Sequence, residues 1–373
     1  MSHVNKQMIS FFLTTDCNLR CVYCYNSNER KKQQTQTLSL EFAKKGLEYF
    51  FKHNPSRHIR FYGPGEPTQK FDLMKEITEY AHKLAGDDLV VELQTNGAFG
   101  KRVREWICQN VDIVWISFDG PPDIQNANRP FPNNKPSAGI IEENVKYLLE
   151  HRKKMDGVIG ARITISEKNI NRQKEMIDYF EKLGITYMWT DPLFPEVTDI
   201  PVCKDVNRKG SQLLNMNEYA DRYIEAYYYA KEKGVFYGSF LACNFDGCSQ
   251  YHCRACTPVP HLTPDGYVSA CDMVTFGEKA HHMEVFVIGK WEEKKKEIVF
   301  YPERIDALQK RKTSNMPHCK DCSVADHCGG YCLGEVVNET GSLYGQKTLH
   351  CVAIKKIAKE IGFSNYPYKY LHP

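Results

Sequence analysis

Three cysteines near the start of the chain have a spacing suited to a metal cluster. Cys17, Cys21 and Cys24 are separated by three and then two residues, and the aromatic Tyr23 stands directly before the last of them. Four cysteines usually hold a [4Fe–4S] cluster, so three thiolates leave one iron open to bind and activate a small molecule. Structural zinc sites instead join two closely spaced cysteine pairs across a long gap, which this run does not match.

The run resembles the signature of the radical S-adenosylmethionine (SAM) enzymes. In that family the three cysteines hold a [4Fe–4S] cluster whose open iron chelates the amino and carboxylate groups of SAM. The reduced cluster then cleaves SAM to a 5'-deoxyadenosyl radical. The resemblance implies that Cys17, Cys21 and Cys24 are cluster ligands and that Tyr23 lies at the cofactor. It also implies a reductant such as flavodoxin or ferredoxin.

Composition and charge are those of an ordinary soluble protein. The chain has 373 residues, 42% of them hydrophobic and 25% charged. Its formal net charge of +3 is too small to predict nucleic-acid binding. It has neither a long apolar run nor a signal peptide, which predicts a cytoplasmic protein with no membrane partner. Without an export signal, its fifteen cysteines favour metal ligation over disulfides.

The elements that must position these cysteines alternate between strands and helices. Helix-like segments, one of them capped by Ser39, separate six strand-like runs. The runs are residues 8–13, 59–62, 89–93, 113–118, 158–165 and 187–189. Such alternation predicts an α/β fold with a parallel sheet, and six repeats match the partial (β/α)6 TIM-like barrel typical of the radical SAM family. Active sites of parallel sheets form where the strands end, and Cys17 follows the first strand.

Residues after the other strands are candidate contacts for SAM. The segment Gly63–Pro67 resembles the family's Gly-Gly-Glu-Pro segment, with Pro64 in place of a glycine, and Ser117–Gly120 resembles its Ser-x-Asp-Gly segment. Arg162 could pair with the methionine carboxylate or form a salt bridge within the barrel. The candidate SAM contacts are Tyr23, Gly63, Gly65, Glu66, Pro67, Thr95, Asn96, Ser117 and Arg162.

A second set of cysteines occupies the C-terminal part of the chain. Four of them have the spacing C-x2-C-x5-C-x3-C, and Asp265-Gly266 upstream reads as a hairpin turn. The pattern resembles the SPASM domain, which implies two auxiliary [4Fe–4S] clusters and three clusters in all. The outer auxiliary cluster would take Cys319, Cys322, Cys328 and Cys351. The inner one would take Cys256, Cys271, Cys332 and a fourth cysteine, preferably Cys248, with Cys253 or Cys243 as alternatives. Structural zinc sites are the competing interpretation.

Asp272, directly after Cys271, is a candidate catalytic residue. Anaerobic sulfatase-maturating enzymes share this architecture, and an aspartate at the matching position is their proposed base. The resemblance implies that Asp272 takes a proton from the substrate after hydrogen-atom abstraction. The alternative is a hydrogen bond that only orients the hairpin.

The two resemblances divide the chain into a barrel (residues 1–205), a bridging helical segment (206–240) and a SPASM domain (241–373). The leading hypothesis is a radical SAM/SPASM enzyme that oxidises a residue in a peptide or protein, such as a maturase of a ribosomally made peptide. The motif starts at Cys17, which leaves no room for an N-terminal precursor-binding domain, so a leader-binding protein is expected to be separate or unnecessary. The alternatives are formylglycine formation in a sulfatase, dehydrogenation of a small molecule, and a non-catalytic metal-binding or electron-transfer protein.

Overall fold

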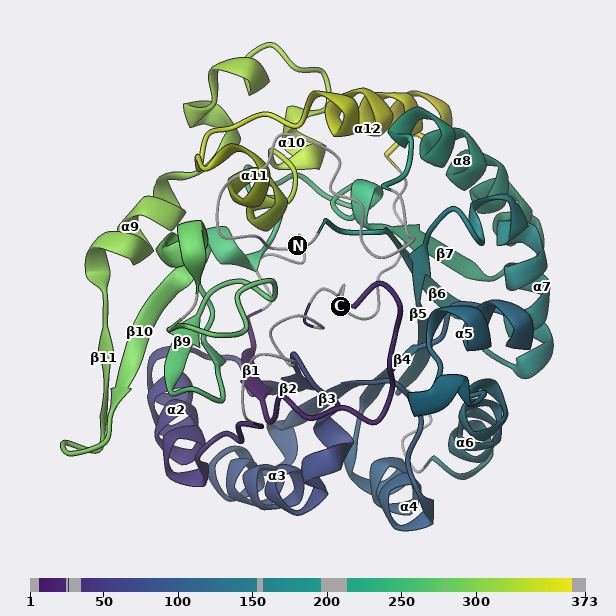
Figure 1. Ribbon diagram of the computed structural model, residues 1–373. Coiled ribbons are helices and arrows are strands. Elements are labelled where there is room, and N and C mark those ends of the chain that lie inside the picture. The colour runs from purple at the N-terminus through teal and green to yellow at the C-terminus, as the bar shows by residue number, and fades with distance from the viewer. Residues whose placement is uncertain are drawn as a thin grey trace.

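A curved sheet ringed by helices is the frame of the molecule (Figure 1). The structure is a computed structural model that describes residues 7–24, 26, 35–152, 157–195, 213–278 and 280–363. The predicted boundary between residues 205 and 206 lies outside these ranges. No helix within them is long and apolar enough to cross a membrane.

The six predicted strands are all present. They are β1 (Ile9–Phe12), β2 (His58–Tyr62), β3 (Val90–Thr95), β4 (Ile113–Ser117), β5 (Val158–Ile165) and β6 (Tyr187–Pro192). They are neighbours in chain order and every pair is parallel, which confirms the predicted barrel class. A further strand that the sequence pattern did not predict, β7 (Phe236–Ser239), continues the sheet in parallel beside β6.

Helices line the outer face of this sheet (Figure 1). They are α2 (Leu40–His53), α3 (Phe71–Ala85), α4 (Lys101–Asn110), α5 (Pro122–Asn128), α6 (Ala138–His151), α7 (Gln173–Leu183) and α8 (Met216–Glu232). Ser39 caps α2 as predicted, because its side chain accepts a hydrogen bond from the Phe42 amide. Since each helix returns the chain to the same end of the sheet, the loops after the strands gather at one mouth of the barrel.

The C-terminal residues extend the same sheet. Strand β8 (His261–Leu262) pairs in parallel with β1, and β9 (Tyr267–Ser269), β10 (Val287–Glu292) and β11 (Glu297–Phe300) follow as antiparallel neighbours. Gly266, at φ +83°, makes the predicted turn between β8 and β9. The helices of this part are α9 (Pro302–Lys310), α10 (Ala325–Cys328), α11 (Leu333–Thr340) and α12 (Thr348–Ile361). The β1–β8 pairing thus holds the C-terminal cysteines against the barrel.

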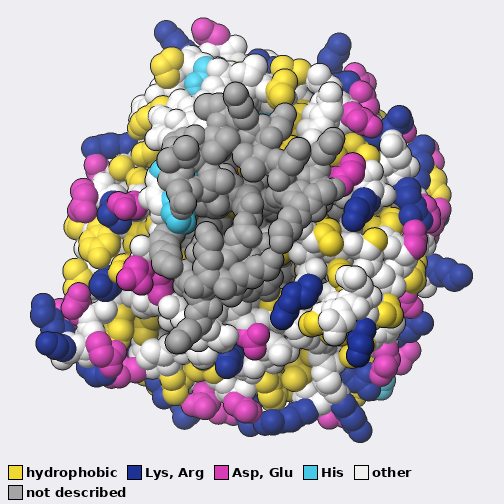
Figure 2. Space-filling model, viewed as in Figure 1, with side chains coloured by type: hydrophobic (Ala, Val, Ile, Leu, Met, Phe, Trp, Pro, Cys, Tyr) yellow, Lys and Arg dark blue, Asp and Glu magenta, His cyan; other side chains and the backbone are white. Residues whose placement is uncertain are grey.

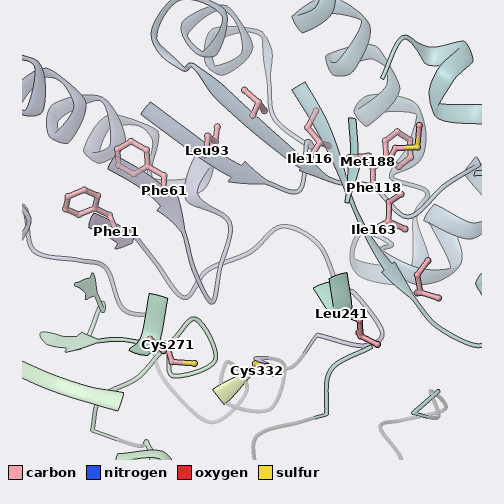
Figure 3. Packing of buried hydrophobic residues seen from close by; sticks show 14 of the residues in the cluster. Phe11, Phe61, Leu93, Ile116, Phe118, Ile163, Met188, Leu241, Cys271 and Cys332 are labelled. Atoms are coloured by element: carbon pink, nitrogen blue, oxygen red, sulfur yellow. The ribbon is translucent and has the colours of Figure 1, made fainter. Parts of the chain in front are cut away.

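Successive side chains of a strand face alternately the hydrophobic core and the interior of the barrel. Phe11, Phe61 and Leu93 belong to the main hydrophobic core of the molecule (Figure 3). Arg60 and Tyr62, which flank Phe61 in β2, instead line a cavity. Successive side chains of a strand point to opposite faces, so one face of β2 stabilises the fold while the other supplies polar groups to the barrel interior.

Charged side chains of both signs are interspersed over the face of the molecule shown in Figure 2. This agrees with the small net charge of +3. Nucleic-acid binding instead draws on a concentrated positive field along the contact surface.

Candidate active site

The first cysteine group lies in the loop after β1. Cys17, Cys21 and Cys24 are half-buried and line one cavity of about 210 Å³. The pKa of the Cys21 thiol is raised to about 12, chiefly by loss of hydration; Arg129 opposes the rise, and the neighbouring Cys24 and Cys17 thiols contribute to it. The three sulfurs are therefore close enough to interact, as ligands of one cluster must be.

The loop that carries this group is pinned against the segment after β2. The Glu66 amide donates to the Asp16 carbonyl at 2.7 Å. A Cβ on Gly65 would stand only 2.2 Å from that same carbonyl oxygen. Gly63 has a φ of +149°, which glycine adopts without strain. Close backbone approach therefore explains the glycines of the Gly63–Pro67 segment.

Gly65→Ala is expected to reduce cluster loading, because the added methyl group would push the segment away from Asp16. Reconstituted Gly65→Ala protein should bind less iron and form less 5'-deoxyadenosine than the parent. The matched control is Gly139→Ala in α6, where no atom lies within 4 Å of the added Cβ. Equal iron content and activity in the two variants would show that the close approach at Gly65 has no such role.

The Glu66 carboxylate points into the protein. It accepts hydrogen bonds from the Thr68 hydroxyl at 2.8 Å, the Thr95 hydroxyl at 2.7 Å and the Asn96 amide at 2.7 Å. Burial raises the pKa of this carboxyl, and these hydrogen bonds oppose the rise. Glu66 thereby ties the loop after β2 to the end of β3. It positions the backbone rather than presenting its own charge to the cavity.

Other predicted SAM contacts lie at the same cavity. Asn96 donates to Asn18 at 2.7 Å and lies 3.8 Å from the Cys17 sulfur. The Tyr23 hydroxyl donates to Asp119. Arg162 pairs with Asp191 at 2.7 Å, so the barrel salt bridge that the sequence left open is present. The predicted residues that line this cavity are Tyr23, Gly63, Gly65, Glu66, Thr95, Asn96, Ser117 and Arg162.

A second cavity, of about 150 Å³, adjoins the first. The two share three lining residues, Tyr62, Arg162 and Phe194. Cysteines 243, 253, 271 and 332 line the second cavity, and Figure 3 shows Cys271 and Cys332 in one region of the interior. Electrostatic coupling links the thiols of Cys253 and Cys256, and those of Cys332 with Cys253 and Cys271. We call Cys253, Cys256, Cys271 and Cys332 the inner group.

The preference for Cys248 as the fourth member of the inner group disagrees with this geometry. Cys248 is exposed, and its sulfur lies 3.9 Å from His327 Nε2. The Ser249 amide donates to the Asp326 carbonyl at 2.7 Å, which holds this loop against α10. The two alternatives, Cys253 and Cys243, line the second cavity.

Cys253→Ala and Cys248→Ala form a matched pair that tests this arrangement. Cys253→Ala is expected to lose one cluster, about four irons per chain, because a member of the inner group is removed. Cys248→Ala should keep the iron content of the parent. Iron and sulfide analysis after anaerobic reconstitution measures both. Iron loss in Cys248→Ala alone would show that Cys248 is the fourth ligand of the inner cluster.

The four cysteines predicted for the outer cluster, which we call the outer group, lie at one cavity. Cys319, Cys322, Cys328 and Cys351 line a third, smaller cavity. The pKa of the Cys319 thiol is raised to about 11, chiefly by burial, with contributions from the neighbouring Cys322 and Cys351. None of these four forms a disulfide within the described residues.

Several of the buried cysteines need a nearby positive charge to ionise. Burial raises the pKa of the thiols of Cys21, Cys256, Cys319 and Cys328. The iron of a [4Fe–4S] cluster would supply that charge and hold them as thiolates. Within the described ranges, no three His, Cys, Asp or Glu side chains converge on a site for one metal ion.

Asp272 lies on the second cavity beside two basic residues. Its Oδ1 is 2.5 Å from Arg60 Nη2 and 3.7 Å from His261 Nε2, and its side chain is 39% exposed. Burial raises the pKa of the Asp272 carboxyl, but Arg60 and His261 outweigh burial and leave the pKa below its usual value. Asp272 is therefore ionised at neutral pH and can accept a proton.

Residues 11–199, about half of the chain, match the Radical SAM superfamily. The chain belongs to the radical SAM superfamily. Its cofactors are therefore a [4Fe–4S] cluster and SAM. As a radical SAM protein it is similar to the radical SAM cyclopropyl synthase TigE of Paramaledivibacter caminithermalis. The two are 22% identical over 361 residues, which cover 90% of this chain and 69% of TigE.

Two further proteins resemble most of the chain. The cysteine-type anaerobic sulfatase-maturating enzyme of Clostridium novyi is 23% identical over 337 residues, covering 86% of this chain and 85% of that enzyme. The solved structure of anSMEcpe with bound AdoMet, another abbreviation of SAM, has a TM-score of 0.75 at 15% identity and covers 95% of this chain and 96% of its own. The fold of this radical SAM protein therefore includes the C-terminal extension.

Sequence reasoning missed the role of Arg129, which lines the first cavity, and of Asp119, the buried carboxylate that pairs with it. Asp119 lies inside the Ser117–Gly120 segment, so the motif included this residue but did not predict its role. Arg129 had no signal, because it lies far along the chain from Cys21, whose sulfur is 3.8 Å from its Nη1.

Proposed function

We propose that this radical SAM enzyme oxidises a residue in a peptide or protein. In this proposal Cys17, Cys21 and Cys24 hold the SAM-binding cluster, and the inner and outer groups hold two auxiliary clusters. One observation carries the proposal, namely that the two cavities share Tyr62, Arg162 and Phe194. A substrate residue in the second cavity would lie between the SAM pocket and Asp272.

Each part of the joined cavity has a task in this reaction. When bound, the reduced cluster supplies the electron that cleaves SAM and yields the 5'-deoxyadenosyl radical. The second cavity holds the substrate carbon that gives up a hydrogen atom. Asp272, kept ionised by Arg60, accepts the proton that the substrate then releases. Three members of the inner group line the same cavity, and the auxiliary cluster they would help to hold would accept the electron left when the substrate radical loses its proton.

Formylglycine formation in a sulfatase is the second candidate. The position of Asp272 directly after Cys271 favours it, as does the likeness to the sulfatase-maturating enzyme of Clostridium novyi over most of both chains. The two candidates share hydrogen abstraction and proton transfer, and they differ in the substrate that enters the second cavity.

Iron analysis and SAM cleavage test the proposal first. Anaerobically reconstituted protein should hold about twelve irons, as expected for three four-iron clusters, and should form 5'-deoxyadenosine with dithionite. Bound zinc, little iron and no 5'-deoxyadenosine would leave a cysteine-rich scaffold.

Mass spectrometry of candidate substrates then separates the two functions. Peptides encoded beside the gene should lose hydrogen if the protein is a peptide maturase. A sulfatase peptide with cysteine or serine at its modification site should gain an aldehyde if the protein forms formylglycine. If only the sulfatase peptide reacts, the peptide-maturase proposal fails.

A further inference from the structure

A buried arginine stands beside the first cysteine group and has no part in the reaction above. Arg129 follows α5, and its side chain is only 11% exposed. Its Nη1 lies 3.8 Å from the Cys21 sulfur, within the range of an N–H···S hydrogen bond. A guanidinium is always charged, so a permanent cation stands at this sulfur.

A buried carboxylate holds this guanidinium in place. Asp119 is fully buried, and its Oδ1 lies 3.3 Å from Arg129 Nε. The same carboxylate accepts hydrogen bonds from the Thr164 amide at 3.0 Å, the Asn128 side chain at 3.1 Å and the Tyr23 hydroxyl. The guanidinium also lies over the Tyr23 ring, 5.1 Å from its centroid. Contacts on both of its sides therefore fix the orientation of Arg129.

Backbone hydrogen bonds fix the distance between Arg129 and the cysteine loop. The Val22 amide donates to the Asn128 carbonyl at 2.9 Å, and the Arg20 amide donates to the Pro130 carbonyl at 2.7 Å. These bonds bracket Cys21 on one segment and Arg129 on the other. The loop that would hold the cluster is thus fastened to the residues on either side of the arginine.

We propose that Arg129 raises the reduction potential of the SAM-binding cluster and so makes its reduction easier. Hydrogen bonds to the cysteine sulfurs and nearby charge are main determinants of the potential of an iron–sulfur cluster. Reduction adds one negative charge to the cluster, and a cation in a poorly hydrated site stabilises that charge. Arg129 is a positioning and tuning residue in this account, which rests on the proposed ligation by Cys17, Cys21 and Cys24.

An EPR-monitored redox titration of the holoenzyme tests the proposal. The reduced SAM-binding cluster is identified as the signal that changes when SAM is added, and its potential is then measured without SAM. Arg129→Gln should lower the reduced fraction at a fixed potential about tenfold, a shift of about 59 mV for a one-electron couple. Arg20→Gln is the matched control, because Arg20 lies in the same loop but donates to the carbonyls of Cys17 and Leu19. It should leave the potential unchanged.

Other outcomes overturn the proposal. An unchanged potential in Arg129→Gln, or an equal shift in Arg20→Gln, removes the tuning role. A higher KM for SAM at unchanged potential would make Arg129 a SAM contact instead. If Arg129→Gln does not fold, the double variant Asp119→Asn, Arg129→Gln removes both buried charges, and its potential should still fall because Arg129 is the charge at the sulfur. A parent protein without a SAM-responsive signal would refute the proposed function itself.

Discussion

Replacing Cys21 by alanine is expected to abolish SAM cleavage. Cys21 is the middle member of the first cysteine group, and its thiol interacts with those of both Cys17 and Cys24. Two cysteines are too few to hold a cluster that already has one open iron. With dithionite and SAM, reconstituted Cys21→Ala protein should form no 5'-deoxyadenosine above background. It should lose about four irons and keep about eight in the auxiliary clusters.

Cys108→Ala is the matched control for this experiment. Cys108 is a buried thiol of α4 that packs in the hydrophobic core and lines none of the three cavities described above. Its removal should cost about 1 kcal/mol of stability and leave both iron content and SAM cleavage intact. SAM cleavage that survives in Cys21→Ala would contradict the assigned cluster site, and equal losses in both variants would point to misfolding.

The first six strands of the barrel could be predicted because each is marked by a local sequence pattern. Runs such as Val158–Ile165 are apolar and β-branched, and amphipathic helices separate them. Strand β8 carries no such mark, since it consists of His261 and Leu262 alone. It exists because Ser10 and Phe11 of β1 offer an open edge, and that contact joins distant parts of the chain. The extension of the sheet into the C-terminal part therefore could not be predicted from a local pattern.

The cysteine groups likewise combine features that local sequence predicts with features that depend on tertiary contacts. Cys17, Cys21 and Cys24 could be predicted to lie together because they are close in sequence and share one short loop. Cys248, the preferred fourth ligand of the inner cluster, is instead exposed, in a loop that the Ser249 amide ties to the Asp326 carbonyl. Arg129 likewise reaches Cys21 only through the folding of the barrel. Local spacing therefore predicted which thiols lie together in the first group, whereas tertiary contacts determine which charged residues lie beside them.

The proposed role of Asp272 depends both on its position in the sequence and on the charged residues around it. The sequence placed it after Cys271, and the structure adds its ion pair with Arg60 at 2.5 Å. Arg60 is only 1% exposed, so its charge is poorly hydrated and favours an ionised partner. Because this holds the pKa of Asp272 below its usual value, the carboxylate stays ionised as the pH falls through the mildly acidic range. It is protonated only at a lower pH than an ordinary aspartate.

Asp272→Asn is therefore expected to separate SAM cleavage from product formation. The amide cannot accept the substrate proton, so product should fall by about 100-fold or more, while 5'-deoxyadenosine still forms and the iron content is unchanged. Mass spectrometry of the substrate and chromatography of 5'-deoxyadenosine measure the two steps. Asp265→Asn is the control, because Asp265 is a carboxylate of the same hairpin that binds Thr263 and does not line the cavity. Normal product formation by Asp272→Asn would refute the role as a base. Loss of iron as well as product would mean instead that the ion pair with Arg60 serves to hold the inner group in place.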